Sequence, residues 1–134
     1  MTIRHALTGL FLLLAMAVVQ PVQAQDNYAY YGFEPDITTN YIRDAEQFRM
    51  GYIRVAIEVM LDDNKYIDVI EHHSPVLRDA FLQIFSTATE RQIKSLTGRD
   101  ELRLDCLERA REIMRRETGQ DLIRDVIFTK YIYH

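Results

Sequence analysis

Two adjacent histidines, His72 and His73, are the residues of this chain that most invite a metal or acid–base interpretation. They open the stretch "HHSPVLRDAFLQIF". Consecutive residues on a helix point in different directions, so they cannot grip one ion as a pair four residues apart can. Ser74 is a preferred N-cap residue, and Pro75 suits the first helical position. The pattern therefore favours a joint between two helices over a metal site.

The other candidates for chemistry are sparse. Cys106 is the single cysteine, so it cannot form an internal disulfide; its helical spacing with Leu102 and Ala110 predicts a buried thiol, with intermolecular pairing or reactivity as the alternative. The stretch Asp62–Asn64 is too compressed for a calcium loop. No Gly-x-Ser-x-Gly elbow, glycine-rich phosphate loop, Cys-x-x-Cys or His-Glu-x-x-His motif occurs. The sequence predicts no enzyme, no metal and no cofactor.

The first 24 residues predict an export signal. Arg4 precedes an apolar run, Ala6–Val19, and small residues at Val22 and Ala24 stand before Gln25. At about 1.5 Å per residue the run reaches about 21 Å, short of the ~30 Å bilayer core. We expect cleavage between Ala24 and Gln25 and export of the mature chain. The alternative is a retained, short membrane anchor.

Length and charge limit the number of domains and the kinds of partner that the mature chain can have. A chain of 134 residues allows one domain, expected over residues 33–134. Without Arg4 it has 15 basic against 20 acidic residues, a net charge of −5, which argues against a nucleic-acid partner. Residues 25–32 are polar, rich in tyrosine and free of helical patterning, so we expect a flexible lead-in. Its tyrosines are possible partner contacts, because tyrosine combines apolar area with a polar tip; they are Tyr28, Tyr30 and Tyr31.

Three segments predict strands. The clearest is Tyr52–Leu61, where apolar and other side chains alternate over ten residues. Arg54 and Glu58 are then neighbours on its wet face rather than a catalytic pair. Residues 33–42 are rich in β-branched and aromatic side chains, and an early proline confines them to an edge or a strand start. Residues 122–134 predict a last strand, which we expect to dock beside Tyr52–Leu61.

The intervening chain predicts helices. A short helix covers residues 65–72, and a second begins at Ser74. A helical turn after it ends in a break at Gly98, and a third helix runs from about Arg99 to Glu117, before a stop at Gly119. Its basic last turns complement the helix dipole or could meet anionic lipid. The order predicts an α+β fold, a small antiparallel-rich sheet with about three helices on one face. The apolar stripe of the second helix comprises Val76, Leu77, Ala80, Phe81, Ile84, Phe85 and Ala88.

Taken in order, the segments past Gly32 resemble the flagellar basal-body-associated FliL family. "FEPDITTNY" is similar to its opening strand, "GYIRVAIEVML" to its long alternating strand and "HSPVLRDAFLQIFST" to its Pro–hydrophobic–Arg-Asp helix start. "TGRDELRLDCLERAREIM" and "IRDVIFTKYIY" are similar to its second long helix and terminal strand. The positions that carry the family pattern are Glu34, Pro35, Asn40, Pro75, Arg78, Asp79, Gly98, Phe128 and Thr129.

The resemblance implies a stomatin-like fold and a non-enzymatic role in the flagellar motor. Family members sit on the periplasmic side of the inner membrane, form homo-oligomers and support the stator, with links to rotation, swimming, swarming and chemotactic motility. They usually have a cytoplasmic tail, a full membrane helix and a long linker, where this chain has a signal-like leader. It could need a partner for anchoring. The alternative is a soluble periplasmic scaffold or binding module without a motor role.

Two interpretations of Arg78 and Asp79 stay open. Either they form a solvated helix start, with Asp79 near the positive helix N-terminus, or Arg78 takes part in a contact between subunits or with the stator. In the second case, Arg78→Glu leaves the monomer folded and weakens the oligomer.

Overall fold

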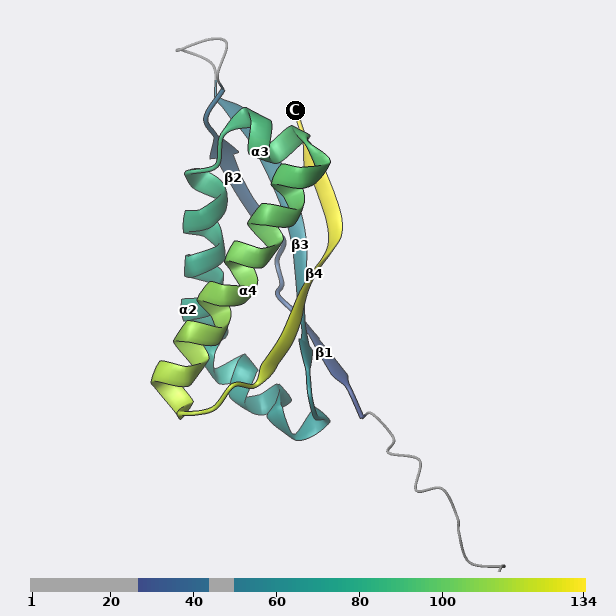
Figure 1. Ribbon diagram of the computed structural model, residues 1–134, viewed down its shortest axis with the longest axis vertical. Coiled ribbons are helices and arrows are strands. Elements are labelled where there is room, and N and C mark those ends of the chain that lie inside the picture. Colours follow the sequence, from purple (N-terminus) through teal and green to yellow (C-terminus); the bar gives the residue numbers. More distant parts are fainter. Residues whose placement is uncertain (1–26, 44–49) are drawn as a thin grey trace, which may run out of the picture.

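The strand β3 (Gly51–Leu61) lies at the centre of the sheet, and each of the other described strands pairs with it in antiparallel orientation. β1 (Ala29–Gly32) and β2 (Ile37–Tyr41) follow one another along one side of β3. β4 (Ile123–Tyr133) runs along the other side over nearly the whole length of β3 (Figure 1). The predicted docking of the last strand beside the alternating strand is confirmed.

This computed structural model describes residues 27–43 and 50–134, so the expected cleavage between Ala24 and Gln25 lies outside the described residues. The α+β prediction is confirmed by a four-stranded antiparallel sheet with three α-helices. The helical elements are the 3-10 helix η1 (Asn64–Tyr66), α2 (Ile67–Ser86), α3 (Glu90–Lys94) and α4 (Leu96–Thr118).

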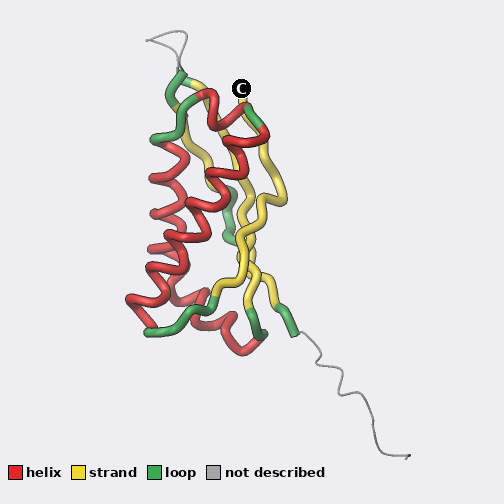
Figure 2. Tube along the Cα trace, viewed as in Figure 1, coloured by secondary structure: helices red, strands yellow, loops and turns green. Residues whose placement is uncertain are grey.

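The two faces of the sheet differ because β3 keeps its alternation throughout. One set of its side chains is buried: Ile53, Val55, Ile57, Val59 and Leu61. The other set is exposed or half-buried: Tyr52, Arg54, Ala56, Glu58 and Met60. α2 packs on the β1–β2 side and α4 on the β4 side of the buried face (Figure 2). The prediction that the helices cover one face is confirmed.

The helix layer supplies a continuous apolar core. Buried residues of α2 and α4 meet the sheet as one cluster that includes Phe81, Phe85, Leu102, Ala110 and Ile113. Cys106 is completely buried in this cluster, as its spacing predicted. Gly119 ends α4 in the left-handed conformation, with φ of 73°, which confirms the predicted stop.

The predicted joint at His72–Ser74 is wrong, because α2 continues through it and Ser74 caps no helix. Ile70 and Leu77 are both fully buried and lie seven residues apart, on one face of the helix. Their burial favours a continuous helix over a break. Pro75 is exposed, so the carbonyl that loses its helical partner can be hydrated. Val76, predicted inward, is exposed because the buried stripe of the continuous helix passes it by.

Two further boundaries differ from the sequence prediction. Ala29–Gly32 is a strand paired with residues 58–61, so the expected flexible lead-in is wrong there. Gly98 is not a break but lies inside the first turn of α4, where its N–H donates to the Ser95 side-chain oxygen over 2.9 Å. Ser95 is therefore the N-cap, and Thr89 caps α3 with a complete capping box.

Gly98→Ala is expected to destabilise the fold. A Cβ at this position would lie 2.4 Å from the Gln92 Cα, and backbone at that distance cannot move aside cheaply. We expect a loss of about 1–3 kcal/mol in the free energy of unfolding, measured by urea denaturation. Gly32→Ala is the control, since the nearest atom to its Cβ is 3.6 Å away. Equal stability of the two variants would contradict the close approach.

Candidate interaction surfaces

The sheet face that no described helix covers is a mixed apolar and charged surface, here called the open face. It presents Tyr30, Tyr52 and Ile132, which are 52%, 40% and 44% exposed. Met60 and Ile127 lie beside them, half-buried. Scattered single apolar residues are ordinary on a protein surface, whereas several on one uncovered sheet face mark a candidate contact.

Three charged side chains, Asp36, Arg54 and Lys130, form ion pairs between the strands on the open face. The Asp36 carboxylate accepts hydrogen bonds from Arg54 at 2.7 Å and from Lys130 at 2.8 Å. Asp36 immediately precedes β2, and its partners belong to β3 and β4, so one carboxylate joins three neighbouring strands. The Lys130 and Arg54 hydrogen bonds hold the pKa of Asp36 below its ordinary value of 3.8.

Asp36→Asn is expected to change how stability depends on pH. A carboxylate whose folded pKa is lowered stabilises the fold while it is ionised. The contribution of Asp36 is therefore complete above pH 3.8 and is lost as the pH falls from 3.8 through the lower folded pKa. Urea denaturation should show the wild type more stable than the variant at neutral pH and equal to it in strong acid. Glu71→Gln is the control, because Glu71 is exposed and forms no ion pair with a described residue. A gap between wild type and Asp36→Asn that persists in strong acid would contradict this role.

Two of the family-pattern positions, 43 residues apart, meet directly. The Arg78 guanidinium, on α2, donates a hydrogen bond to the carbonyl oxygen of Pro35, in the segment between β1 and β2. The peptide bond between Glu34 and Pro35 is cis. Arg78 therefore fastens the helix layer to the point where the sheet edge passes from β1 to β2. This contact gives Arg78 a role within the monomer, and its proposed role between subunits stays a prediction.

Arg78→Ala is expected to lower stability by removing the charged donor to Pro35. A hydrogen bond with one charged partner contributes about 1.5–3 kcal/mol, and the low end applies at this partly exposed position. Thermal or urea denaturation of the purified domain measures the loss. Asp79→Ala is the matched control, since Asp79 is exposed and, among the described residues, its side chain bonds only to Gln83 on the same helix. If both variants were as stable as the wild type, the hydrogen bond between Arg78 and Pro35 would contribute nothing to the free energy of unfolding.

The other family-pattern positions are spread over the domain. Glu34 and Thr129 line one small cavity at the gap between β1 and β2, about 230 Å³ in volume. Asn40 is exposed on β2, and its amide is 3.9 Å from the Met50 sulfur. Phe128 stacks on Tyr131 inside the fold, with ring centroids 5.8 Å apart. These positions do not converge on one catalytic centre.

The tyrosines of the expected lead-in have different environments. Tyr30 points from β1 onto the open face, whereas Tyr31 is partly buried and meets Phe33 edge-on at 5.1 Å between ring centroids. Tyr28 lies under the guanidinium of Arg124, 5.0 Å from the ring centroid. Of the three, Tyr30 is the most available for contact with a partner.

The residues singled out for chemistry do not form a reactive site. His73 Nδ1 lies 2.8 Å from the Val69 carbonyl oxygen, an ordinary helical contact, and His72 packs against its ring. Burial raises the pKa of the Cys106 thiol, so it stays protonated and is a poor nucleophile. Within residues 27–43 and 50–134, no group of three or more metal-binding side chains is found.

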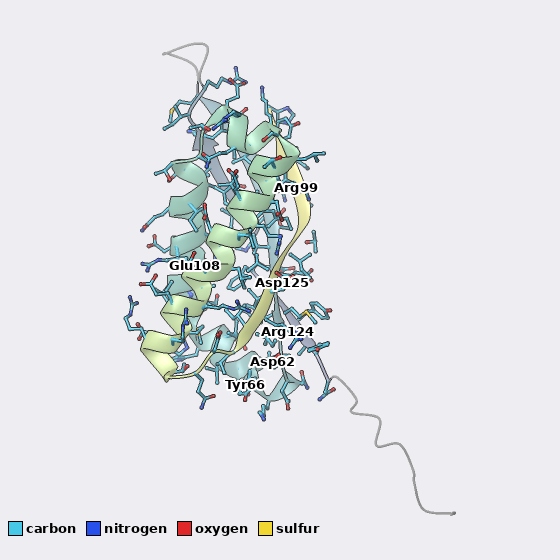
Figure 3. The ribbon with its side chains drawn as sticks, viewed as in Figure 1. Asp62, Tyr66, Arg99, Glu108, Arg124 and Asp125 are labelled. Carbon is cyan, nitrogen blue, oxygen red and sulfur yellow. The ribbon has the colours of Figure 1, made fainter. Side chains whose placement is uncertain are left out.

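Two grooves flank α4. The first, about 430 Å³, lies between α4 and β4 and is lined by Leu96, Arg99, Asp100, Arg103 and residues 126–128, with Asp125 beside them. The second, about 360 Å³, lies between α2 and α4 and is lined mainly by polar residues, among them Asp105, Glu108, Arg109 and Glu112. Figure 3 shows Arg99 and Asp125 along the β4 side of α4, with Glu108 on the side toward α2.

Arg103 illustrates what sequence reasoning missed. It bonds to Asp100 at 3.0 Å and to Asp125 on β4 at 2.6 Å, so it ties the helix to the strand. Asp36 was missed in the same way. Opposite charges on predicted wet faces are a weak signal, because the pairing of the strands must be known before the partners can be matched.

Comparison with known proteins identifies the domain. The family described as "Flagellar basal body-associated protein FliL" matches residues 30–133, nearly the whole described fold. The chain belongs to the FliL family. The resemblance drawn from the motifs is thereby confirmed.

A named FliL relative agrees with this membership. "Flagellar protein FliL" of Aquifex aeolicus (strain VF5) is 31% identical over 102 residues. The matched segment is 76% of this chain and 59% of the relative, so the chain spans about three-fifths of that FliL protein. Among the described residues of the chain, we find no helix with the length and apolar character needed to cross a membrane.

Proposed function

We propose that this FliL-family protein is a non-enzymatic accessory component of the flagellar basal body and motor. It supports stator activity and thereby flagellar rotation, swimming, swarming and chemotactic motility. The observation that carries the proposal is the FliL match over residues 30–133, which includes nearly all of the folded domain. The name of the Aquifex relative, a flagellar protein, supports the same role.

The proposed mode of action is contact with copies of itself and with stator or basal-body proteins. Support comes from the open face, where exposed tyrosines and an isoleucine surround the Asp36 ion pairs. Tyrosine suits such contacts because it brings large apolar area and a hydroxyl for hydrogen bonding. A sheet with one helix layer leaves this face available for association.

The proposed location is the periplasm, at the inner membrane near the basal body. The sequence of the first 24 residues supports export. A cleaved leader requires the domain to be held by a partner, whereas a retained leader would anchor it directly.

Deletion of the gene tests the motor role. We expect reduced swimming and swarming, with the larger defect in viscous medium, where the stator works against higher load. Motility is measured in ordinary and viscous medium, and restoring the gene must restore it. Normal motility in both media would remove the motor role and leave a periplasmic scaffold of the same fold as the better account.

Tyr52→Lys tests self-association through the open face. The exposed ring can be replaced without opening the core, so we expect a folded monomer whose dissociation constant for self-association rises about tenfold or more. Sedimentation velocity over a concentration series measures it. Val76→Lys is the matched control, an exposed apolar residue on the outer side of α2. If Tyr52→Lys associated as the wild type does, the interface would not include this part of the open face.

A further inference from the structure

The outer edge of β4, the side away from β3, presents backbone groups that described residues occupy along one half of the strand and not along the other. Tyr52 and His134 exchange both of their backbone hydrogen bonds, at 3.2 and 2.9 Å. In an antiparallel pair, backbone groups face the partner strand at alternate positions. His134 therefore faces β3, and so do Ile132 and Lys130. The register shift between residues 128 and 130 then leaves the backbone groups of Phe128, Tyr131 and Tyr133 facing outward, away from β3.

The first half of this edge is blocked by side chains. Arg111 donates to the carbonyl oxygens of Ile123 and Arg124, both at 2.8 Å. The Asp125 carboxylate accepts from the N–H of Val126, also at 2.8 Å. Such groups occupy the positions that another strand would use. The second half has no comparable cover among the described residues, and no described group bonds to the outward amides of Phe128, Tyr131 and Tyr133.

The groove between α4 and β4 lies along this edge. Val126–Phe128 form its strand side, and Leu96, which is 86% exposed, stands on its helix side. A groove bounded by an edge strand and a helix is the arrangement in which proteins bind an extended peptide by strand addition. Backbone bonds to β4 would hold such a peptide, and every second side chain would enter the groove.

The charge in the groove defines the chemistry of the occupant. Asp100 and Asp125 are both paired with Arg103. Arg99 forms no ion pair with a described residue; its guanidinium lies 4.7 Å from the centroid of the Tyr131 ring. Leu96 and Arg99 are three residues apart on α4, hence neighbours on one helix face. The groove therefore offers an apolar contact, Leu96, next to a cation, Arg99, that has no acidic partner among the described residues.

We propose that the β4 edge binds an extended segment of a partner protein that carries an aliphatic side chain and, two residues away, an acidic one. The segment adds as a strand beside Phe128–Tyr133, its aliphatic side chain against Leu96 and its carboxylate at Arg99. This docking mode goes beyond the proposed motor role and does not depend on it, because it follows from the edge and the groove alone.

Amide exchange of the free protein, followed residue by residue by NMR, tests the premise. The outward amides of Phe128, Tyr131 and Tyr133 should exchange faster than the amides of Ile127 and Lys130, which face β3. Protection of the outward amides that increases with protein concentration would mean that a second copy occupies the edge. That result would overturn the peptide proposal.

A capped heptapeptide, Thr-Leu-Thr-Glu-Thr-Leu-Thr, is the binding probe. It reads the same in both directions, so either strand orientation places leucine and glutamate on the groove side. With a dissociation constant of about 0.1 mM, about 1 mM peptide should slow exchange at Phe128 and Tyr131 about tenfold. Replacing both the third threonine and the leucine that follows it by proline should abolish the effect in either orientation, because this removes an N–H from each edge of the peptide strand.

Charge exchange tests the role of Arg99. Arg99→Glu should lose the protection given by the glutamate peptide and regain it with the peptide that carries lysine in its place. Leu96→Asp should weaken binding about tenfold or more, whereas Leu82→Asp, an equally drastic change on the outer side of α2, should leave it unchanged. Absence of protection up to about 1 mM peptide, or equal binding of both peptides to both proteins, would overturn the proposal.

Discussion

The structure depends on the register of β3. Every described strand pairs with it, and its strict alternation decides which side of the whole sheet meets the helices. A slip of one residue against β4 would turn the buried set, Ile53 to Leu61, toward solvent. At about 1.5–3 kcal/mol for each of the five aliphatic side chains, such a slip would cost about 8–15 kcal/mol, as much as the typical stability of a whole domain. The positions of the helices and of the other strands therefore follow from which face of β3 is apolar.

How far the sequence predicts the fold depends on how long each pattern runs. The eleven residues of β3 and of β4 carry period-two or β-branched patterns that leave little ambiguity, and both strands were predicted. β1 has four residues, of which only Ala29 is buried, so no local pattern distinguishes it from a loop. It becomes a strand because the half of β3 beyond β2 is available to pair with it. That cause is tertiary and cannot be read from "AYYG".

α2 shows a conflict between local and tertiary signals. Ser74 and Pro75 form a strong helix-start signal, yet the helix runs through them. A cap contributes about 1 kcal/mol, whereas burying Ile70 and Leu77 on one continuous face contributes several. Burial of the two side chains therefore outweighs the cap, and the helix stays continuous. Tertiary structure also explains Arg78: the family pattern marks the residue, but only the structure shows that it bonds to Pro35 and joins helix to sheet.

The candidate contact surfaces arise where the helices leave the sheet uncovered. The three described helices on one face suffice to bury the core, so the opposite face keeps Tyr30, Tyr52 and the partly exposed Asp36 ion pairs uncovered by them. An edge strand that is open along its whole length would invite uncontrolled pairing. β4 avoids this in its first half, where Arg111 and Asp125 occupy the backbone groups; from Phe128 onward no described residue bonds to its outward amides. General protection against aggregation would cover both halves. Protection of one half only leaves a short template of defined length beside a groove, and a short template with one apolar contact and one cation restricts pairing to segments of matching chemistry.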